Sequence, residues 1–207
     1  MSYCRSIALS SHTQDESGYL PAAAVAPARD RIISVATRLF YRRGVRTVGV
    51  NTVVSESQVA KTTLYEHFRS KDELIAACLE RLDERYFRWF VNEVERRADG
   101  PVERLLAMFD VYDEWFQSPD FRGCAFINAA VELADPSHPA AAAIANHKRR
   151  ARDLLRELAQ EAGFPDAGAV SDHLTLLMEG AIVTALVEGD WQAARRARAA
   201  AVRLLDV

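Results

Sequence analysis

Apolar residues recur three and four positions apart along almost the whole chain that follows Pro27. This spacing places them on one face of an α-helix, and the strict alternation of apolar and polar residues that marks a β-strand is nearly absent. In the first such segment the recurring apolar residues are Ile32, Ile33, Ala36, Leu39 and Phe40. The sequence therefore predicts an all-α fold.

Glycine, proline and capping residues divide this region into about nine helices. Pro27 is suited to the start of the first helix, and Gly44 to its end. Ser70 and Glu73, in the stretch "SKDE", form a capping box that starts a long helix. The predicted helices cover residues 28–43, 50–56, 60–67, 70–94, 101–117, 121–134, 139–162, 167–188 and 191–205.

The chain has 207 residues, 49% of them hydrophobic, which suits one large domain or a small domain joined to a larger one. Residues 1–26 are rich in Ser, Ala and Pro and lack helical periodicity, so we expect a disordered tail there. We divide the rest into an N-terminal domain of residues 27–75 and a C-terminal domain of residues 76–207.

Several features point to the cytoplasm. No apolar run of the sequence approaches the roughly 18–20 residues that a membrane-spanning helix needs, and the first residues are too polar for the core of a signal peptide. Cys4, Cys78 and Cys124 are odd in number and far apart, which fits neither a disulfide framework nor a zinc site. Cys124 lies near the start of a predicted helix, where a thiol can have a lowered pKa, so a redox role stays open beside simple packing.

The sequence does not carry the motifs of an all-α enzyme. A di-iron carboxylate bundle needs two Glu-x-x-His motifs, and the chain has none. A phosphate-binding glycine loop is also absent, and no Ser/His/Asp group is recognisable, although such triads are set by geometry. His138, His147 and His173 do not pair with a second ligand at metal-binding spacing. We therefore expect no enzyme activity, metal or cofactor.

The stretch "VAKTTLYEHFRSK", residues 59–71, combines an apolar face with an unusually polar outer face. Val59, Leu64 and Phe68 are spaced for burial. The short helix before them and the tight turn "SESQ" complete the length of a helix-turn-helix. In such a unit the second helix offers its outer face to the major groove of DNA.

The side chains on that outer face suit DNA. Lys61 and Lys71 can neutralise phosphates, and Tyr65 and His67 can donate hydrogen bonds to phosphate oxygens. The small threonine side chains let the helix backbone approach base edges. Residues 28–75 carry nine Lys and Arg against five Asp and Glu, although the whole chain has a net charge of −3. Only this domain is therefore expected to meet a polyanion.

Residues 29–79 resemble the DNA-binding domain of TetR-family transcriptional regulators. The features that carry the resemblance are Ala36, Leu39-Phe40, Gly44, "VAKTTLYEHF" at 59–68 and "SKDEL" at 70–74. The resemblance implies a cytoplasmic homodimer that binds a near-palindromic operator in double-stranded DNA, with a small-molecule effector in the C-terminal domain that releases it. The residues that we assign to the DNA-binding face are Arg46, Gly49, Asn51, Lys61, Thr62, Thr63, Tyr65, His67 and Lys71.

Four positions depart from the family pattern. Gly49 stands where the family usually has Ser or Thr, but its N–H group can still meet a phosphate. Gln58 replaces the usual turn glycine, at a cost of about 1 kcal/mol. Ala60 replaces a frequent Ser, and Glu66 is unexpected beside phosphates unless it accepts from a cytosine amino group. These changes bear on the operator sequence and not on DNA binding itself.

The C-terminal domain is rich in aromatic residues at helical spacing, and its residues 121–149 resemble a segment of one branch of such regulators. Most aromatic residues belong to a core, but several together permit an apolar pocket whose few polar groups orient a ligand. The residues that we nominate for an effector pocket are Phe90, Phe109, Tyr112, Trp115, Phe116, Phe126, Asn128, Glu132, His147 and Met178.

The last two predicted helices, 167–188 and 191–205, combine spaced apolar residues with small Ala and Gly residues. Small residues permit helices to approach closely, so two such helices from each of two subunits could form a four-helix interface. The alternative is that both belong to the core of one subunit. We favour the dimer, because helix-turn-helix proteins pair to bind two half-sites.

Two further functions remain open on the same scaffold. The first is an activator or a DNA-binding regulator that needs no ligand. The second is a protein-interaction module with a lapsed DNA face, against which Lys61, Tyr65 and Lys71 argue.

Overall fold

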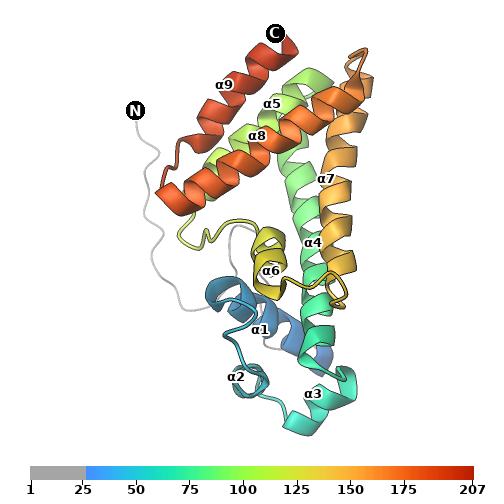
Figure 1. Cartoon of the computed structure of the whole chain (residues 1–207), viewed down its shortest axis with the longest axis vertical. Helices are drawn as coiled ribbons and strands as arrows, with labels where there is room; N and C mark the ends of the chain where they lie inside the picture. The colour runs from blue at the N-terminus through green and yellow to red at the C-terminus, as the bar shows by residue number, and fades with distance from the viewer. Residues whose placement is uncertain (1–26) are drawn as a thin grey trace.

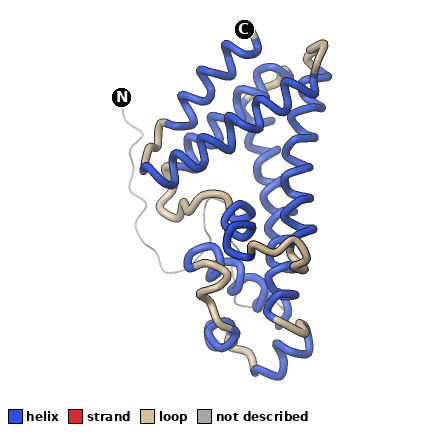
Figure 2. The backbone as a smooth tube through the Cα atoms, in the orientation of Figure 1, coloured by secondary structure: helices blue, strands red, loops and turns tan. Residues whose placement is uncertain are grey.

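The computed structural model describes residues 27–207, and every regular element in this range is an α-helix (Figure 2). The all-α prediction is therefore confirmed. The predicted tail, residues 1–26, lies outside the described residues. The helices of the described range are α1 (Ala28–Arg43), α2 (Val50–Ser57), α3 (Lys61–His67), α4 (Lys71–Arg97), α5 (Pro101–Phe116), α6 (Ala125–Leu133), α7 (Ala141–Glu161), α8 (Ala167–Glu188) and α9 (Ala193–Leu205).

The predicted helix bounds are close to these, and the largest difference is at α6. This helix begins at Ala125 and not at residue 121, because Gly123 takes a left-handed φ of +74° and interrupts the helical path. Phe121, just before it, is buried in the core and anchors the loop that leads into α6.

The molecule is elongated, with α1, α2 and α3 at one end (Figure 1). We call these three helices the head and α5–α9 the body. α4 leads from the head into the body, where it lies alongside α7. α8 packs mainly against α7 and α9, and α9 packs on α5.

The head is held together by the face that the apolar spacing predicted. Leu64 and Phe68 of the α3 region have exposed fractions of 0% and 1%, and Val53 of α2 has 1%. Val59 is only half-buried, since it lies in the turn before α3. Removing these apolar groups from water fixes how α3 sits on α1 and so which face of α3 stays outside.

The turn between α2 and α3 contains Gln58 in the left-handed conformation, with φ 52° and ψ 46°. For an L-residue other than glycine this conformation brings Cβ close to the following carbonyl oxygen. The strain predicted for a side chain at this position is therefore present. Its backbone N–H donates to Ser55 O, which closes the end of α2.

We expect Gln58→Gly to stabilise the protein against urea by about 1 kcal/mol, because glycine takes this conformation without the Cβ penalty. Ser55→Gly is the matched control, since Ser55 is exposed in the same helix with helical geometry. That control should lose stability. A loss in both variants would show that the left-handed turn carries no strain.

The capping box at the start of α4 forms with one shift. Ser70 Oγ accepts from the backbone N–H of Glu73 at 3.1 Å, as predicted. The Glu73 carboxylate reaches back to the N–H of Arg69 at 2.8 Å, one residue before the cap. Both bonds fix the angle at which α4 leaves α3.

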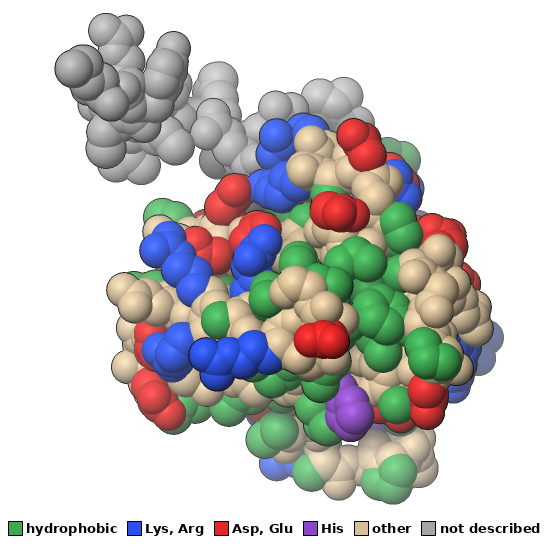
Figure 3. Space-filling view, turned by 90° about the horizontal axis from the view of Figure 1, so that it is seen from above, with side chains coloured by type: hydrophobic (Ala, Val, Ile, Leu, Met, Phe, Trp, Pro, Cys, Tyr) green, Lys and Arg blue, Asp and Glu red, His purple; other side chains and the backbone are tan. Residues whose placement is uncertain are grey.

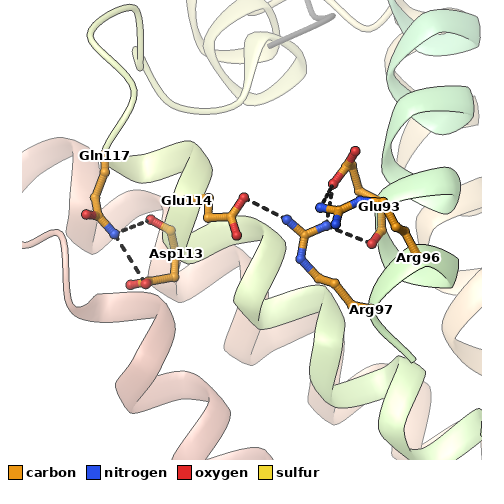
Figure 4. Close-up of polar contacts among 6 residues, drawn as sticks. All are labelled: Glu93, Arg96, Arg97, Asp113, Glu114 and Gln117. Carbon is orange, nitrogen blue, oxygen red and sulfur yellow. Dashed lines mark hydrogen bonds and ion pairs between the residues drawn. The ribbon is translucent and has the colours of Figure 1, made fainter. Parts of the chain in front are cut away.

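The other end of α4 is joined to α5 by a charged cluster (Figure 4). Arg97 of α4 contacts Glu93 one turn earlier and donates from Nη2 to Glu114 Oε2 of α5 at 2.6 Å. The side chain of Arg97 is only 14% exposed but that of Glu114 is 69% exposed, so this pair is expected to contribute at most about 1 kcal/mol. α4 is thus fixed to the body at one end and to the head at the other.

Three residues, Tyr41, Arg42 and Arg46, make polar contacts between the head and the α6 region. The Tyr41 hydroxyl donates to Gly123 O at 3.1 Å and accepts from the Arg122 N–H at 2.9 Å. The Arg46 N–H donates to Glu132 Oε2 at 2.9 Å. Arg42 pairs with Asp120 at 2.6 Å. α6 therefore acts as a bridge between the body and the head.

The prediction that no apolar run reaches the length of a membrane-spanning helix is wrong for α8. Within residues 27–207 it is the helix long and apolar enough to cross a bilayer, with a mean hydropathy of 1.4, so one apolar run does reach that length. Only 39% of its apolar window is buried within the chain, because apolar residues lie on its outer side as well as against α7 and α9. Packed helices of globular proteins meet the same criterion, so this is weak evidence for a membrane.

Candidate nucleic-acid interface and body cavities

The outer face of α3 is exposed as its sequence predicted. Lys61, Thr62, Tyr65 and His67 are all exposed, and Thr63 is half-buried. The Tyr65 ring is a large apolar surface left 45% exposed at the end of the molecule. A short helix that exposes cationic and polar side chains at both ends, with small threonines between them, can enter a DNA major groove.

The start of α2 is the second part of the predicted DNA-binding face. Gly49 is the N-cap of α2 and has an extended conformation. Because glycine has no side chain, no side-chain cap accepts from the first N–H groups of the helix. A Cβ at Gly49 would meet nothing within 4 Å, so lack of space does not require the glycine. Asn51, in the first turn, is exposed. Such an uncapped helix start suits a phosphate.

Arg46 and Lys71 are placed differently from the other predicted residues. The Arg46 guanidinium donates to Leu133 O at 3.3 Å, so it is bound to the end of α6 in the body. Lys71 is half-buried, and its Nζ lies 3.4 Å from Arg46 O. Both cations would have to leave these contacts, or share them, to meet a phosphate.

The aromatic residues of the body surround a small cavity, which we call the body cavity. Its volume is about 40 Å³. Five of the ten residues nominated for an effector pocket line it: Phe90, Tyr112, Trp115, His147 and Met178. An enclosed space of this size holds little more than a water molecule, so a larger ligand requires the helices to move apart.

The other five nominated residues lie elsewhere. Phe109, Phe116 and Phe126 have exposed fractions of 1%, 0% and 0% and are not among the residues that line the cavity. Phe126 stacks on the His147 ring at 3.6 Å between centroids and so supports the wall from behind. Asn128 and Glu132 line a second cavity, between the head and the body.

His147 is the central polar group of the body cavity. Its Nδ1 lies 2.7 Å from Asp83 Oδ1, and Arg150 contacts the other oxygen of Asp83. Burial lowers the pKa of His147, but hydrogen bonds with Asp83 and Cys124 outweigh it, so the pKa lies above its ordinary value. The imidazole is therefore held in a fixed orientation and favours its protonated form.

Cys124 lies at the N-cap of α6 and faces the same cavity. Burial alone would raise the pKa of its thiol, but a hydrogen bond with His147 and the charge of Lys148 lower it below the ordinary value. Lys148 Nζ is 3.8 Å from Cys124 Sγ and 3.0 Å from Glu179 Oε1. The thiol thus has two cationic neighbours.

The two described thiols should react at very different rates. In a Cys4→Ser background at pH 7, we expect iodoacetamide to alkylate Cys124 at least about tenfold faster than Cys78, because only a thiolate is reactive. Burial raises the pKa of Cys78 to about 12, whereas the pKa of Cys124 is lowered. Peptide mass spectrometry over time measures both rates, and His147→Gln should slow Cys124 selectively. Equal rates would show that the pKa of the Cys124 thiol is not lowered relative to that of Cys78.

Sequence reasoning missed several polar residues of this cavity. The hydroxyls of Tyr86 and Tyr112 lie 3.0 Å apart on its wall, and Thr175 and Glu179 of α8 complete the lining. Tyr86, Lys148 and Glu179 come from three helices, so no local spacing signalled that they meet. The nearest signal was the short polar run around His147 on α7, a helix that otherwise packs against α4 and α8.

The model for bacterial regulatory proteins of the tetR family matches residues 32–78, and that for the Tetracyclin repressor-like C-terminal domain matches residues 101–201. The crystal structure of SCO4454, a TetR-family transcriptional regulator from Streptomyces coelicolor, is 32% identical with a TM-score of 0.74. That match covers 85% of this chain and 94% of the other. The chain belongs to the TetR family.

Two further relatives are HTH-type transcriptional regulators of lower identity. The regulator LmrA of Bacillus subtilis is 26% identical over 162 residues, 76% of this chain and 86% of LmrA. An HTH-type regulator from the lacX 3′ region of Lactococcus lactis is 28% identical over 109 residues, 51% of this chain, which spans about half (54%) of that relative. As a member of this family of helix-turn-helix transcriptional regulators, the protein has α2 and α3 as its helix-turn-helix.

Proposed function

We propose that this TetR-family protein is a cytoplasmic homodimeric repressor that binds a near-palindromic operator and is released from it by a small molecule. The observation that carries the proposal is the outer face of α3, where Lys61, Thr62 and Tyr65 are exposed above a fully buried Leu64. A core that fixes the helix and an outer face with small and cationic side chains are what major-groove reading requires.

The DNA contacts fall into two kinds. Lys61, Tyr65, His67 and the N-terminus of α2 at Gly49 are suited to phosphates, which set register and affinity. Thr62 and Thr63 are suited to base edges, which set sequence preference. Arg46, Asn51 and Lys71 complete the proposed face at its edge, with Arg46 and Lys71 exchanging their present contacts for phosphates.

A dimer is supported by the outer side of α8. Leu176, Val183 and Val187, with Gly180 between them, lie at helical spacing on one stripe, and the three side chains are 69%, 45% and 75% exposed. Trp191, just before α9, is 48% exposed. Figure 3 views the body from the end opposite the head and shows hydrophobic side chains at the surface among Lys and Arg. Water contact with so many large apolar groups is unfavourable and would be removed by a second copy.

The effector is proposed to enter the body cavity between α4, α5, α7 and α8. Phe90, Tyr112, Trp115 and Met178 provide the apolar walls, and His147 orients a polar group of the ligand. Because the cavity must enlarge, the ligand favours a conformer with α4 displaced from α7, and α4 carries that change to the head. A regulator that needs no ligand, or an activator, is the alternative.

The first test is fluorescence anisotropy on DNA from upstream of the protein's own gene, with a scrambled duplex as control. We expect nanomolar preference for the native fragment, and a steep loss of affinity between about 50 and 200 mM salt. Equal binding to both duplexes, or binding that ignores salt, would contradict a sequence-specific operator contact.

Lys61→Ala tests the orientation of α3 in the same assay. We expect it to weaken binding to all DNA sequences by about tenfold and to reduce the salt slope by about one unit, since it removes one phosphate contact. Arg149→Ala removes an equally exposed cation on α7 and should leave DNA affinity unchanged. Unchanged affinity in Lys61→Ala would mean that another face of α3 meets DNA.

A further inference from the structure

The second cavity lies between the head and the body, and we call it the head–body cavity. Its volume is about 310 Å³. It is lined by Phe40 of α1, Ile75 and Leu79 of α4, Ala129 of α6 and Leu186 near the end of α8. The first four of these side chains are buried and form an apolar part of the wall, whereas Arg43, Arg122, Asn128 and Glu132 bring polar groups to the rest of it. An apolar cavity of about 150 Å³ is known to bind benzene, so this one has room for about two rings.

One polar group inside this cavity lacks a partner. The Thr37 hydroxyl lines the cavity, is buried, and makes no hydrogen bond. Burial raises the pKa of the neighbouring Cys78 thiol, and the Thr37 hydroxyl lowers it in part. A thiol is a weak hydrogen-bond acceptor, however, and Cys78 Sγ already donates to Ile33 O at 3.6 Å. A buried hydroxyl without a partner is unfavourable, and a ligand group that bonded to it would remove that penalty.

The charged groups at the cavity wall are already engaged. The Glu132 carboxylate accepts the Arg46 N–H at 2.9 Å, and the Arg122 guanidinium donates to Phe121 O at 2.7 Å. Arg43 lies 3.8 Å from Glu56. Arg43 and Arg122 are exposed, so a charged ligand held beside the buried Thr37 would lose its water without a charged partner there, whereas a neutral ligand needs no such partner.

We propose that the head–body cavity is a second small-molecule site, separate from the body cavity, which takes a neutral molecule of about two rings with one hydrogen-bonding group directed at Thr37. Asn128 and Glu132, nominated from the sequence for an effector pocket, belong to this site.

The position of the site gives it a structural consequence. It is lined by Tyr41 and Glu132, which take part in two of the contacts that hold the head to the α6 region, Tyr41 with Gly123 and Arg46 with Glu132. A molecule that fills the space adds contacts to both sides and stabilises the present position of the head. Its binding does not depend on DNA, whereas any effect on the operator rests on the proposed function.

Equilibrium dialysis with neutral 2-naphthol at pH 7 tests the site, with 2-methylnaphthalene as a probe of the same shape that lacks the hydroxyl. We expect saturable binding of one 2-naphthol per chain. Thr37→Val keeps the shape of the side chain and should weaken 2-naphthol about tenfold while leaving 2-methylnaphthalene unchanged.

Two filling variants locate the molecule. Ala129→Phe fills the head–body cavity and should abolish binding, whereas Ala151→Phe fills the body cavity and should leave binding intact. The opposite result would place the molecule in the body cavity and overturn the proposal. Absent 2-naphthol binding in the native protein, or unchanged affinity in Thr37→Val, would also overturn it. DNA affinity is not part of this test, so its failure leaves the repressor proposal standing.

Discussion

Val183→Arg should convert the protein from a dimer to a monomer and weaken operator binding more than about a hundredfold. Val183 lies in the middle of the exposed apolar stripe of α8, between Leu176 and Val187. In the proposed interface an arginine there would bury an unpaired charge against apolar side chains of the second subunit. Losing the dimer removes the simultaneous binding of two half-sites, which typically contributes a factor of about 10² to 10⁴.

Light scattering after size exclusion measures the mass, and anisotropy on the operator measures the affinity. Val131→Arg is the matched control, because Val131 is 75% exposed on α6, outside α8 and α9. It should remain a dimer with native DNA affinity. A Val183→Arg protein that stays dimeric would show that the subunits meet through another surface.

Asp83→Ala should lower the free energy of unfolding by about 3 kcal/mol, near the lower end of the cost of breaking a buried ion pair. Asp83 is 8% exposed and holds both His147 and Arg150. Its removal leaves the buried His147 ring without its carboxylate, while Arg150, about half exposed, can return to water. The loss is therefore not at the upper end of the range.

The effect of Asp83→Ala should depend on pH with a definite sign. The pKa of His147 is raised in the folded protein, partly by Asp83. The stability that this contact adds is fully present below the unfolded pKa of about 6.5 and is lost as pH rises through the folded value. The difference between native protein and variant should therefore be larger at pH 6 than at pH 9.

Urea unfolding at the two pH values measures this difference. Asp120→Ala is the control, because the Arg42–Asp120 pair has side chains 49% and 43% exposed and such pairs contribute at most about 1 kcal/mol. Equal losses in the two variants would show that the Asp83–His147–Arg150 group carries no special stability.

The head was predictable from the sequence because its signals are local. The Ser70 cap, the buried residues Leu64 and Phe68 of the α3 region and the exposed face of Lys61 and Tyr65 all follow from spacings of a few residues. The strained turn at Gln58 was also expected, because Gln58 replaces the glycine that the family usually has at this position. Family resemblance then supplied the function that these local features suit, and the comparisons support the family.

The body was predictable only as a set of helices. Phe109 and Tyr112 lie one turn apart on α5, yet Tyr112 lines the body cavity and Phe109 does not. Periodicity shows that both are buried, but which of them meets empty space depends on how α4, α7 and α8 cross α5. The same limit explains why Asn128 and Glu132 were grouped with residues of the body cavity, although they line the head–body cavity.

By itself the sequence determined the all-α class, the helices of residues 27–207, their caps and the exposed side of α3. These depend on hydrogen bonds and apolar faces within one or two turns of a helix, so neighbouring residues are enough to predict them. Only the tertiary structure decided where the two cavities lie, that His147 meets Asp83 and Cys124, and that α6 joins body to head. Those contacts bring together residues from separate helices, and their positions follow from the packing of the whole chain.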